Sequence, residues 1–216
     1  MRALTAATQQ QLADATAEEV LAYAVQRFHP RLTLACSFQK EESVLFHMLS
    51  QLPARSEPLR AFTIDTGVLF PETLQTWKRF EDRFPEIHID VLDAHTPGAP
   101  WTAEHCCSAA KVAALELALS DVDAWITGIR REQATTRAQA PKLERDERRG
   151  ILKLNPLADW TDKDVWTYIF KHDLPYNPLH DQGYDSIGCQ PCTVPGSGRD
   201  GRWAGSDKTE CGIHLS

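Results

Sequence analysis

Residues 32–50 read LTLACSFQKEESVLFHMLS, and this stretch decides the fold of the chain. It opens with a short apolar run, Leu32–Ala35, that predicts a strand, and it closes with Glu41–Ser50, whose apolar spacing predicts a helix. The same order returns in Leu59–Ile64, an apolar run of strand length, and Pro71–Arg83, a second predicted helix. Strands that alternate with helices at this spacing are typical of a parallel sheet.

The rest of the chain continues this alternation. Further strands are expected at Ile87–Leu92 and Ala124–Thr127, and further helices at Thr16–Arg27, Cys107–Leu119 and Asp162–Lys171. The pattern predicts an α/β fold with a mostly parallel sheet and helices on both faces. In such sheets, ligands bind beyond the carboxyl ends of the strands.

The last stretch differs in composition. From Thr193 to Ser216 the chain holds five of its eleven glycines and has no clear periodicity. A terminal segment of this kind is expected to be mobile. We therefore expect a single domain overall, folded over residues 1–192 and followed by a flexible tail over residues 193–216.

The net charge of −7 argues against a general nucleic-acid or anionic-membrane binder. It leaves room for a small anionic substrate held by a local basic cluster. Such a cluster lies between Arg130 and Arg149, where the alternative for its later members is a solvated loop balanced by acidic neighbours. The basic residues of this run are Arg130, Arg131, Arg137, Lys142, Arg145, Arg148 and Arg149.

Targeting signals are not evident in the sequence. No apolar run approaches the roughly 20 residues that span a bilayer, and the polar stretch of residues 1–20 has no apolar core of a secretory signal. We therefore expect a cytoplasmic protein, in which the six cysteines serve metal binding or catalysis rather than disulfides.

Two cysteine pairs carry a metal-binding pattern. Cys106-Cys107 and Cys189-Gln190-Pro191-Cys192 supply four thiolates, which can hold a metal ion or an iron–sulfur cluster. Spacing alone does not separate zinc from a cluster, and adjacent cysteines can also be core thiols or a vicinal disulfide. Lys111 follows Cys107 by four residues on the same helix face, where its charge would stabilise a negative cluster.

A further thiol stands alone near the end of the chain. Cys211 lies between Lys208 and His214, and nearby cations raise the thiolate fraction of a cysteine. We interpret it as a nucleophile on a mobile segment, against the alternative of an idle tail thiol. Cys36, by contrast, ends an apolar strand and is interpreted as a buried small hydrophobe.

Polar residues follow several predicted strands. Ser37 precedes a helix start that suits a phosphate or sulfate, and Asp65 and Thr66 lie within reach of a nucleotide. Arg130 and Arg131 come just after another strand, and their guanidinium groups suit bidentate anion binding. The alternatives are ordinary cap and turn chemistry for the first group and surface arginines for the second.

Several of these motifs, with others further along, carry a resemblance to a known family. They are Ser37-Phe38, Asp65-Thr66-Gly67, Phe70-Pro71-Glu72-Thr73, Thr127-Gly128-Ile129-Arg130-Arg131-Glu132-Gln133, Asn155-Pro156-Leu157, Tyr176-Asn177-Pro178-Leu179-His180, Gly183-Tyr184, Ile187-Gly188-Cys189, Gly201-Arg202-Trp203 and Glu210-Cys211-Gly212-Ile213-His214. From about Leu32 to His214 the chain resembles the thioredoxin-dependent assimilatory adenylyl-sulfate (APS) reductases, relatives of the 3′-phosphoadenylyl-sulfate (PAPS) reductases.

The resemblance implies a Rossmann-like adenine nucleotide alpha-hydrolase-type fold, with a nucleotide-binding reductase domain over residues 1–192 and a catalytic tail over 193–216. It also implies a [4Fe–4S] cluster, a group that typical PAPS reductases lack. Its ligands would be Cys106, Cys107, Cys189 and Cys192.

The resemblance further implies a reaction in sulfate assimilation and cysteine biosynthesis. The Cys211 thiolate attacks the sulfate sulfur of APS, AMP leaves, and thioredoxin or a glutaredoxin-like reductant releases sulfite from the S-sulfocysteine. The sulfate–phosphate end of the site would be lined by Lys111, Arg130, Arg202 and His214. The nucleotide would be contacted by Ser37, Thr66 and Gly128.

Two departures from the family pattern stand near the site. Ala110 replaces a basic residue that usually precedes Lys111, and Gln39 stands where a glycine commonly follows the phenylalanine. Three alternatives stay open: a PAPS or dual-specificity reductase, a sulfur transferase acting on RNA, and a zinc-stabilised binding module. The second usually carries a Ser-Gly-Gly-x-Asp-Ser loop, and the third leaves Cys211 unexplained. Assembly into a homo-oligomer is also open.

Overall fold

A computed structural model describes residues 5–53, 55–95 and 109–203. In these ranges six strands form one sheet in the order β3-β2-β1-β4-β6-β5. All neighbouring strands pair parallel except β5 and β6, which are antiparallel. The strands are β1 Leu32–Ala35, β2 Leu59–Asp65, β3 Ile87–Asp93, β4 Ala124–Ile126, β5 Leu143–Asp146 and β6 Ile151–Leu154.

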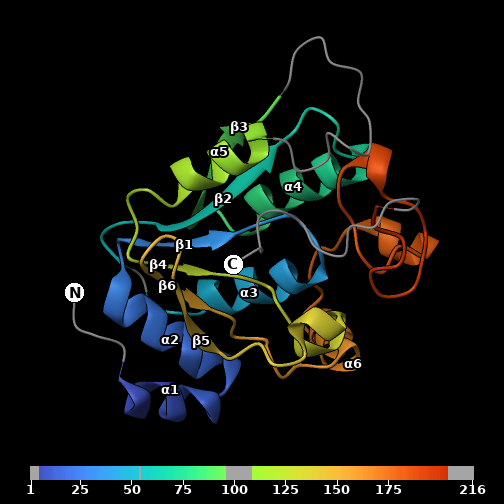
Figure 1. Ribbon diagram of the computed structural model, residues 1–216. Helices are drawn as coiled ribbons and strands as arrows, with labels where there is room; N and C mark the ends of the chain where they lie inside the picture. The colour runs from blue at the N-terminus through green and yellow to red at the C-terminus, as the bar shows by residue number, and fades with distance from the viewer. Residues whose placement is uncertain (1–4, 54, 96–108, 204–216) are drawn as a thin grey trace.

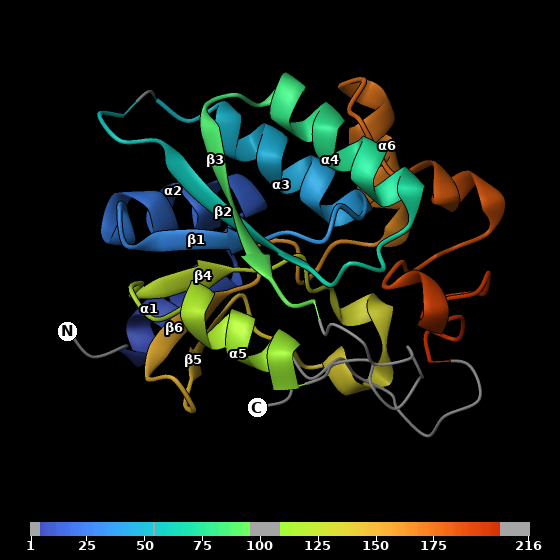
Figure 2. The same ribbon diagram turned by 90° about the horizontal axis from the view of Figure 1, so that it is seen from above.

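Helices cover both faces of this sheet, as Figure 2 shows: α5 lies on one side, and α2, α3, α4 and α6 lie on the other. The α/β class and the mostly parallel sheet expected from the sequence are therefore confirmed. The helices are α1 Ala6–Ala13, α2 Ala17–Phe28, α3 Lys40–Ser50, α4 Pro71–Arg83, α5 Ala109–Ala118 and α6 Asp162–Lys171. None of the helices in the described ranges is long and apolar enough to cross a membrane.

The period of two along the strands divides the core into two layers. In β4, Ala124 and Ile126 pack into the layer beneath α2, α3 and α6, whereas Trp125 between them packs into the layer beneath α5. In β2, Phe62 and Ile64 join the α5 layer. Because both faces are covered, these strands read as apolar runs rather than as alternating ones.

Capping residues explain where the helices begin. The Thr16 hydroxyl accepts a hydrogen bond from the Glu19 backbone N–H, and the Glu19 carboxylate accepts one from the Thr16 N–H. Thr161 and Asp164 form the same reciprocal box at the start of α6. Each box satisfies two backbone donors that the first turn leaves without an intrahelical partner. Pro71 opens α4, where its missing N–H is not needed.

Among the α-helices and strands of the described ranges, α1, β5 and β6 were not predicted from the sequence. The hairpin of β5 and β6 occupies part of the basic run, and its turn ends at Gly150, which has a φ of 69°. Arg149 donates hydrogen bonds to Asp146 at 2.7 Å and to Glu116 at 2.9 Å, and Arg148 pairs with the same Glu116. These later arginines are therefore balanced by acidic neighbours, and the hairpin they belong to is ordered.

The helix expected at Cys107–Leu119 appears as α5, Ala109–Ala118, while residues 107 and 108 lie outside the described ranges. The first residues of the expected flexible tail form backbone hydrogen bonds. Between residues 193 and 203, the Val194 N–H donates to the Gly201 carbonyl at 2.9 Å and the Trp203 N–H to the Cys192 carbonyl at 2.9 Å. Residues 204–216 are outside the described ranges.

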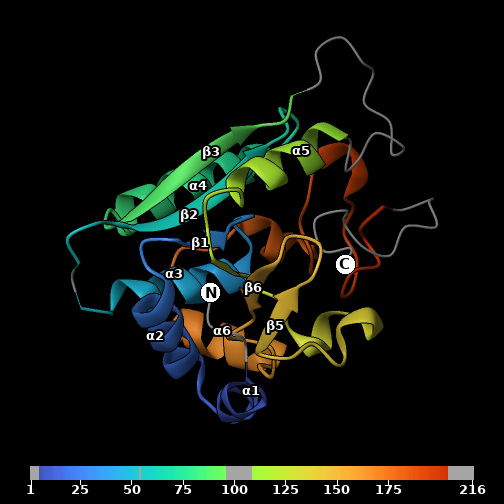
Figure 3. The ribbon, with the colours of Figure 1, turned by 60° about the vertical axis from the view of Figure 1, so that its left-hand side comes forward.

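The sheet order turns at β1, which pairs with β2 on one side and β4 on the other. Chain connections run in opposite directions from this point, so the loops after β1 and β4 separate and leave a crevice. The arrowheads of β1 and β2 point toward the orange and red segment after α6 (Figure 1). A second view shows this segment at the same end of the sheet (Figure 3).

Candidate functional site

A pocket with a volume of about 410 Å³ lies at this turning point of the sheet. That volume falls within the range of small-molecule sites. Its walls come from the β1–α3 loop, the strand end of β2, the start of α5, the loop after β4 and the segment of residues 185–202. Its polar and charged lining includes Ser37, Gln39, Lys40, Glu41, Glu42, Lys111, Arg130, Glu132, Gln133, Arg137, Asp162, Asp185, Ser186, Arg199 and Arg202.

The β1–α3 loop is held in a tight conformation. Phe38 has a φ of 58°, which is uncommon for a residue with a side chain. Its ring is buried and stacks on Trp77 at a centroid distance of 5.4 Å. Gln39, by contrast, has a φ of −89°. No glycine is therefore required at position 39, and the departure from the family pattern does not strain the backbone there.

Gln39 also ties the loop to the segment that follows α6. Its Oε1 accepts a hydrogen bond from the Ile187 backbone N–H at 2.8 Å and from the Ser186 hydroxyl at 3.4 Å. A glycine cannot make these bonds, so the side chain joins two walls of the pocket.

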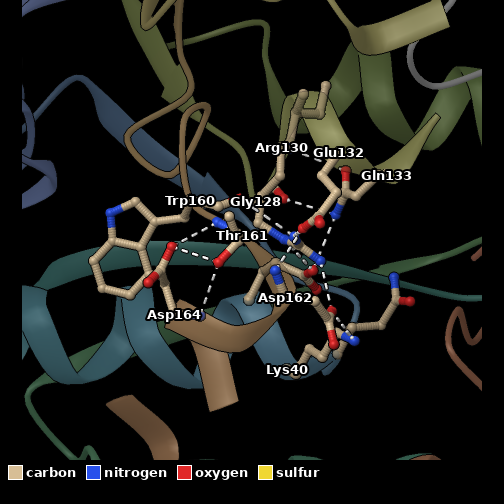
Figure 4. Close-up of polar contacts among 12 residues, drawn as sticks. Lys40, Gly128, Arg130, Glu132, Gln133, Trp160, Thr161, Asp162 and Asp164 are labelled. Carbon is tan, nitrogen blue, oxygen red and sulfur yellow. Dashed lines mark hydrogen bonds and ion pairs between the residues drawn. The ribbon is translucent and has the colours of Figure 1, made fainter. Parts of the chain in front are cut away.

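Arg130 is the centre of a buried charge network after β4 (Figure 4). Its Nε donates to Glu41 at 2.9 Å and its Nη2 to Asp162 at 3.0 Å. Its Nη1 donates to Glu132 at 3.1 Å and to the Trp160 carbonyl at 3.3 Å. Arg130 therefore lines the pocket while most of its donors serve protein acceptors.

Gln133 connects this charge network to the backbone that follows β4. Its Oε1 accepts from the Arg130 backbone N–H at 3.0 Å and from Arg137 Nη1 at 2.6 Å. Its Nε2 donates to Glu41 at 3.1 Å and to the Gly128 carbonyl at 3.2 Å. One amide thus fixes two arginines and the backbone of the loop.

The adjacent carboxyl groups Glu41 and Glu42 respond oppositely to burial. Burial alone would raise the pKa of Glu41, but the charges of Arg130 and Lys40 outweigh it and lower that pKa below its ordinary value. No cation in the described part of the chain pairs with Glu42, and burial, with the Glu41 charge, raises its pKa to about 8. The pKa values of the two neighbours therefore shift in opposite directions.

Gly128 lies where the loop after β4 meets α3. A Cβ at this position would lie 2.7 Å from Glu42 Oε1 and 2.8 Å from Glu41 Cβ. Both distances are shorter than a normal contact, so only glycine permits this approach of backbone to the two carboxyl-bearing side chains.

Arg202 brings a second guanidinium to the pocket from the described end of the chain. It is 9% exposed, and its Nη1 donates to the Ser186 hydroxyl at 3.2 Å and to the Ile187 carbonyl at 3.1 Å. Its buried Nε has no hydrogen-bond partner among the described residues. Such a donor suits an anion that enters from the pocket.

Cys189 is the N-cap of the short 3₁₀ helix η5, Gln190–Cys192, and Cys192 is its last residue; both cysteines are buried. Cys189 lines the pocket, and its Sγ lies 3.2 Å from the Thr66 hydroxyl, within hydrogen-bond distance. A hydroxyl group that hydrogen-bonds to a cysteine sulfur can orient that sulfur as a metal ligand. This half of the predicted four-thiolate set therefore fits a metal centre or a cluster.

The described ranges bring together most of the predicted contact residues. Ser37, Lys111, Gly128, Arg130 and Arg202 all line the one pocket. Thr66 is buried beside Cys189 and is not among the lining residues. The remaining predicted site residues lie outside the described ranges: Cys106, Cys107, Cys211 and His214.

Sequence reasoning assigned no site role to Glu41, Glu42, Gln133 or Asp162, although Gln133 belongs to one of the family motifs. The signal available was the pair of glutamates at the start of a helix that directly follows a buried strand. Acidic residues in the first turn of a helix are usually explained by capping and by the helix dipole. The sequence therefore provided no reason to place these glutamates in the pocket.

Comparisons with known proteins place this geometry in a family. Residues 31–195 match the Phosphoadenosine phosphosulfate reductase domain. The chain belongs to this family. A family relative from Gloeobacter violaceus named phosphoadenosine 5′-phosphosulfate reductase is 44% identical over 94% of this chain and 90% of its own length. Another from Bacillus mycoides, named adenosine 5′-phosphosulfate reductase, is 42% identical over 91% of this chain and 89% of its own length.

Solved structures support the same family fold. The phosphate complex of PAPS reductase from Candida auris has a TM-score of 0.70 and 28% identity, covering 89% of this chain and 98% of that one. FMN adenylyltransferase from Candida glabrata has a TM-score of 0.65 with 16% identity, covering 90% of this chain and 69% of that one. The latter likeness shows the fold alone. The expected adenine nucleotide alpha-hydrolase-type fold is therefore confirmed.

Proposed function

We propose that this chain reduces APS to sulfite and AMP, with a Cys211 S-sulfocysteine as intermediate and thioredoxin as the electron donor. The observation that carries the proposal is one pocket that gathers Ser37, Gly128, Lys111 and Arg202 beside Cys189. A nucleotide-type crevice, cationic side chains and a candidate cluster thiol thus share one cavity. The adenosine 5′-phosphosulfate reductase name of the Bacillus relative supports the same substrate.

The first step transfers a sulfonate group. The Cys211 thiolate attacks the sulfur of APS, a sulfur–sulfur bond forms, and the bond from that sulfur to the bridging phosphate oxygen breaks. AMP leaves with the electron pair of that bond. Lys111, Arg202 and His214 would offset the negative charge on the transferred group, and Arg130 would stabilise the same end of the site through its charge.

The second step restores the enzyme. A thioredoxin thiolate attacks the Cys211 sulfur and releases sulfite, which leaves a mixed disulfide. The second thioredoxin cysteine resolves that disulfide and returns Cys211 as a thiol, so thioredoxin supplies two electrons for each sulfite. We assign Cys211 to a flexible catalytic segment within residues 193–216 that moves between the pocket and the reductant.

Cys106, Cys107, Cys189 and Cys192 would hold a [4Fe–4S] cluster in this proposal. The burial of Cys189 and Cys192 and the Thr66 contact to sulfur support that ligand role. When bound, the cluster would polarise the sulfate end of the site without passing electrons. Lys111, on the helix that follows the first cysteine pair, would offset its negative charge. We place the reaction in the cytoplasm, where these thiols stay reduced.

A second candidate is the reduction of PAPS, because the Gloeobacter relative at 44% identity carries that name. The four-cysteine pattern favours APS over this alternative. Intact mass spectrometry after incubation with APS and, separately, PAPS, without thioredoxin, tests both. We expect APS to add one sulfonate to Cys211 and thioredoxin to remove it. An adduct from PAPS alone would move the protein to the alternative, and no adduct on a cluster-loaded protein would refute the proposal.

A further inference from the structure

Glu42 is a buried carboxyl group without a cation partner in the described ranges. Its residue is 5% exposed, and one oxygen, Oε2, accepts hydrogen bonds from the Gln39 N–H at 2.9 Å and the Ser37 hydroxyl at 3.2 Å. Its neighbour Glu41 takes the Arg130 guanidinium instead. A buried carboxylate usually needs such a partner, so Glu42 calls for a different explanation from Glu41.

Glu42 lines the pocket, and its second oxygen, Oε1, lies against Gly128. Both Glu42 and Gly128 line the cavity, and Oε1 is the atom that a Cβ on Gly128 would approach to 2.7 Å. The glycine therefore leaves room for this oxygen where the loop after β4 meets the start of α3. The hydrogen bonds from Gln39 and the Ser37 hydroxyl go to Oε2, and the Ser37 backbone also stabilises the carboxyl group.

Burial and a neighbouring negative charge favour the protonated form of Glu42. Burial and the Glu41 carboxylate raise the pKa of Glu42 to about 8. The titratable groups that interact with Glu42 are Glu41 on α3 and the Cys36 thiol at the end of β1, whereas the charges of Lys40 and Arg130 act on Glu41. Because Oε2 already accepts two hydrogen bonds, Oε1 is the oxygen that carries the proton.

We propose that Glu42 binds the nucleotide as a neutral carboxylic acid, with its Oε1–H donating a hydrogen bond to an uncharged acceptor on the nucleoside. The assignment rests on the proposed function, since it requires an adenine nucleotide in this pocket. It makes Glu42 a substrate-binding residue in addition to its structural role of holding Ser37 and Gln39. An ionised Glu42 would lose this donor and repel the phosphate-bearing ligand, so it would bind the nucleotide poorly.

The test is calorimetric titration of AMP into the full-length protein at pH 7 and pH 9. Above pH 7 the phosphate of AMP is already doubly ionised, since its second pKa is about 6. With a pKa of about 8, the neutral fraction of Glu42 falls roughly tenfold across this interval. We therefore expect the affinity of the wild-type protein for AMP to fall by about the same factor.

Two substitutions separate binding from packing. Glu42→Gln supplies an amide N–H in place of the acid O–H and cannot ionise, so we expect affinity within about threefold of wild type at pH 7 and no loss at pH 9. Glu42→Ala should weaken AMP about tenfold at pH 7, as expected for a lost hydrogen bond in a dry site. Glu86→Gln, an exposed position between α4 and β3, is the matched control and should follow wild type at both pH values.

A ribose 5-phosphate titration locates the acceptor. If the acceptor lies on the ribose, Glu42→Ala lowers the affinity for both AMP and ribose 5-phosphate. If the acceptor lies on adenine, Glu42→Ala lowers the affinity for AMP alone. Either result supports the assignment. The assignment is overturned if Glu42→Gln keeps the wild-type pH dependence, or if Glu42→Ala binds AMP as tightly as wild type. Failure of the wild-type protein to bind AMP at either pH would instead overturn the proposed function and this assignment with it.

Discussion

Removing the Arg130 guanidinium should be among the most destabilising single changes in the described ranges. Arg130→Met keeps most of the aliphatic stem and deletes the charge. Glu41, whose side chain is 5% exposed, would then keep a buried carboxylate without its guanidinium partner. Glu132 and Asp162 are about half exposed, at 53% and 48%, so water replaces much of their interaction with Arg130.

The magnitude therefore comes mainly from the pair of Arg130 and Glu41. Breaking a buried ion pair by removing one partner costs about 3–5 kcal/mol. For a chain of this length, each kcal/mol lowers the melting temperature by about 2–4 °C. We expect Arg130→Met to lower Tm by about 6–20 °C and the free energy of unfolding by about 3–5 kcal/mol, measured by urea titration at pH 7.

The double variant Arg130→Met/Glu41→Gln isolates the pair. Because it removes both charges, it should be more stable than Arg130→Met alone. Lys78→Met breaks the exposed pair with Asp82 and serves as the control, for which we expect no measurable change. A loss below about 1 kcal/mol in Arg130→Met, or a double variant no more stable than the single one, would refute the reasoning.

The pH dependence of this effect has a definite sign. The folded protein lowers the pKa of Glu41 from its ordinary value of 4.5. A lowered carboxyl pKa adds stability that is present above the unfolded-state value and is lost as the pH falls through the folded-state value. The stability difference between wild type and Arg130→Met should therefore shrink below about pH 4.5.

Four further outcomes can be measured. Cys211→Ser should bind APS yet form no sulfonate adduct in intact mass spectrometry, and normal sulfite release by this variant would contradict the mechanism. Cys189→Ser should lose iron and sulfide by chemical analysis and lose activity, with a smaller drop in nucleotide affinity, whereas Cys36→Ser should keep its iron. Gly128→Ala should lower stability by about 1–3 kcal/mol in urea titration, because its Cβ would collide with Glu41 and Glu42; unchanged stability would mean that α3 moves freely. The stability of wild type should decline relative to Glu42→Gln as the pH rises from 4.5 through about 8, because the folded state raises the pKa of Glu42 and so binds the proton more tightly than the unfolded chain; parallel stability curves would show that it does not.

Local patterns in the chain predicted most of the fold. The bounds of β1 and of the helices α4 and α6 agree with those expected from the sequence. Apolar runs, capping threonines and the proline at a helix start are short-range signals, so they can be read without tertiary contacts. The hairpin of β5 and β6 was missed because its charged residues resemble a solvated loop until Arg149 meets Glu116 on α5.

The candidate site also has features that the sequence predicts and features that depend on tertiary contacts. The sequence by itself determined which residue types are present: the cysteine pairs, the basic residues and the small residues after the strands. Only the tertiary structure decided which of them share a pocket and which charges are compensated. Glu41 and Arg130 are 89 positions apart in the chain yet form a 2.9 Å ion pair. Glu42, one residue further on, has no such partner among the described residues, and this difference in long-range contacts shifts the pKa values of two adjacent glutamates in opposite directions.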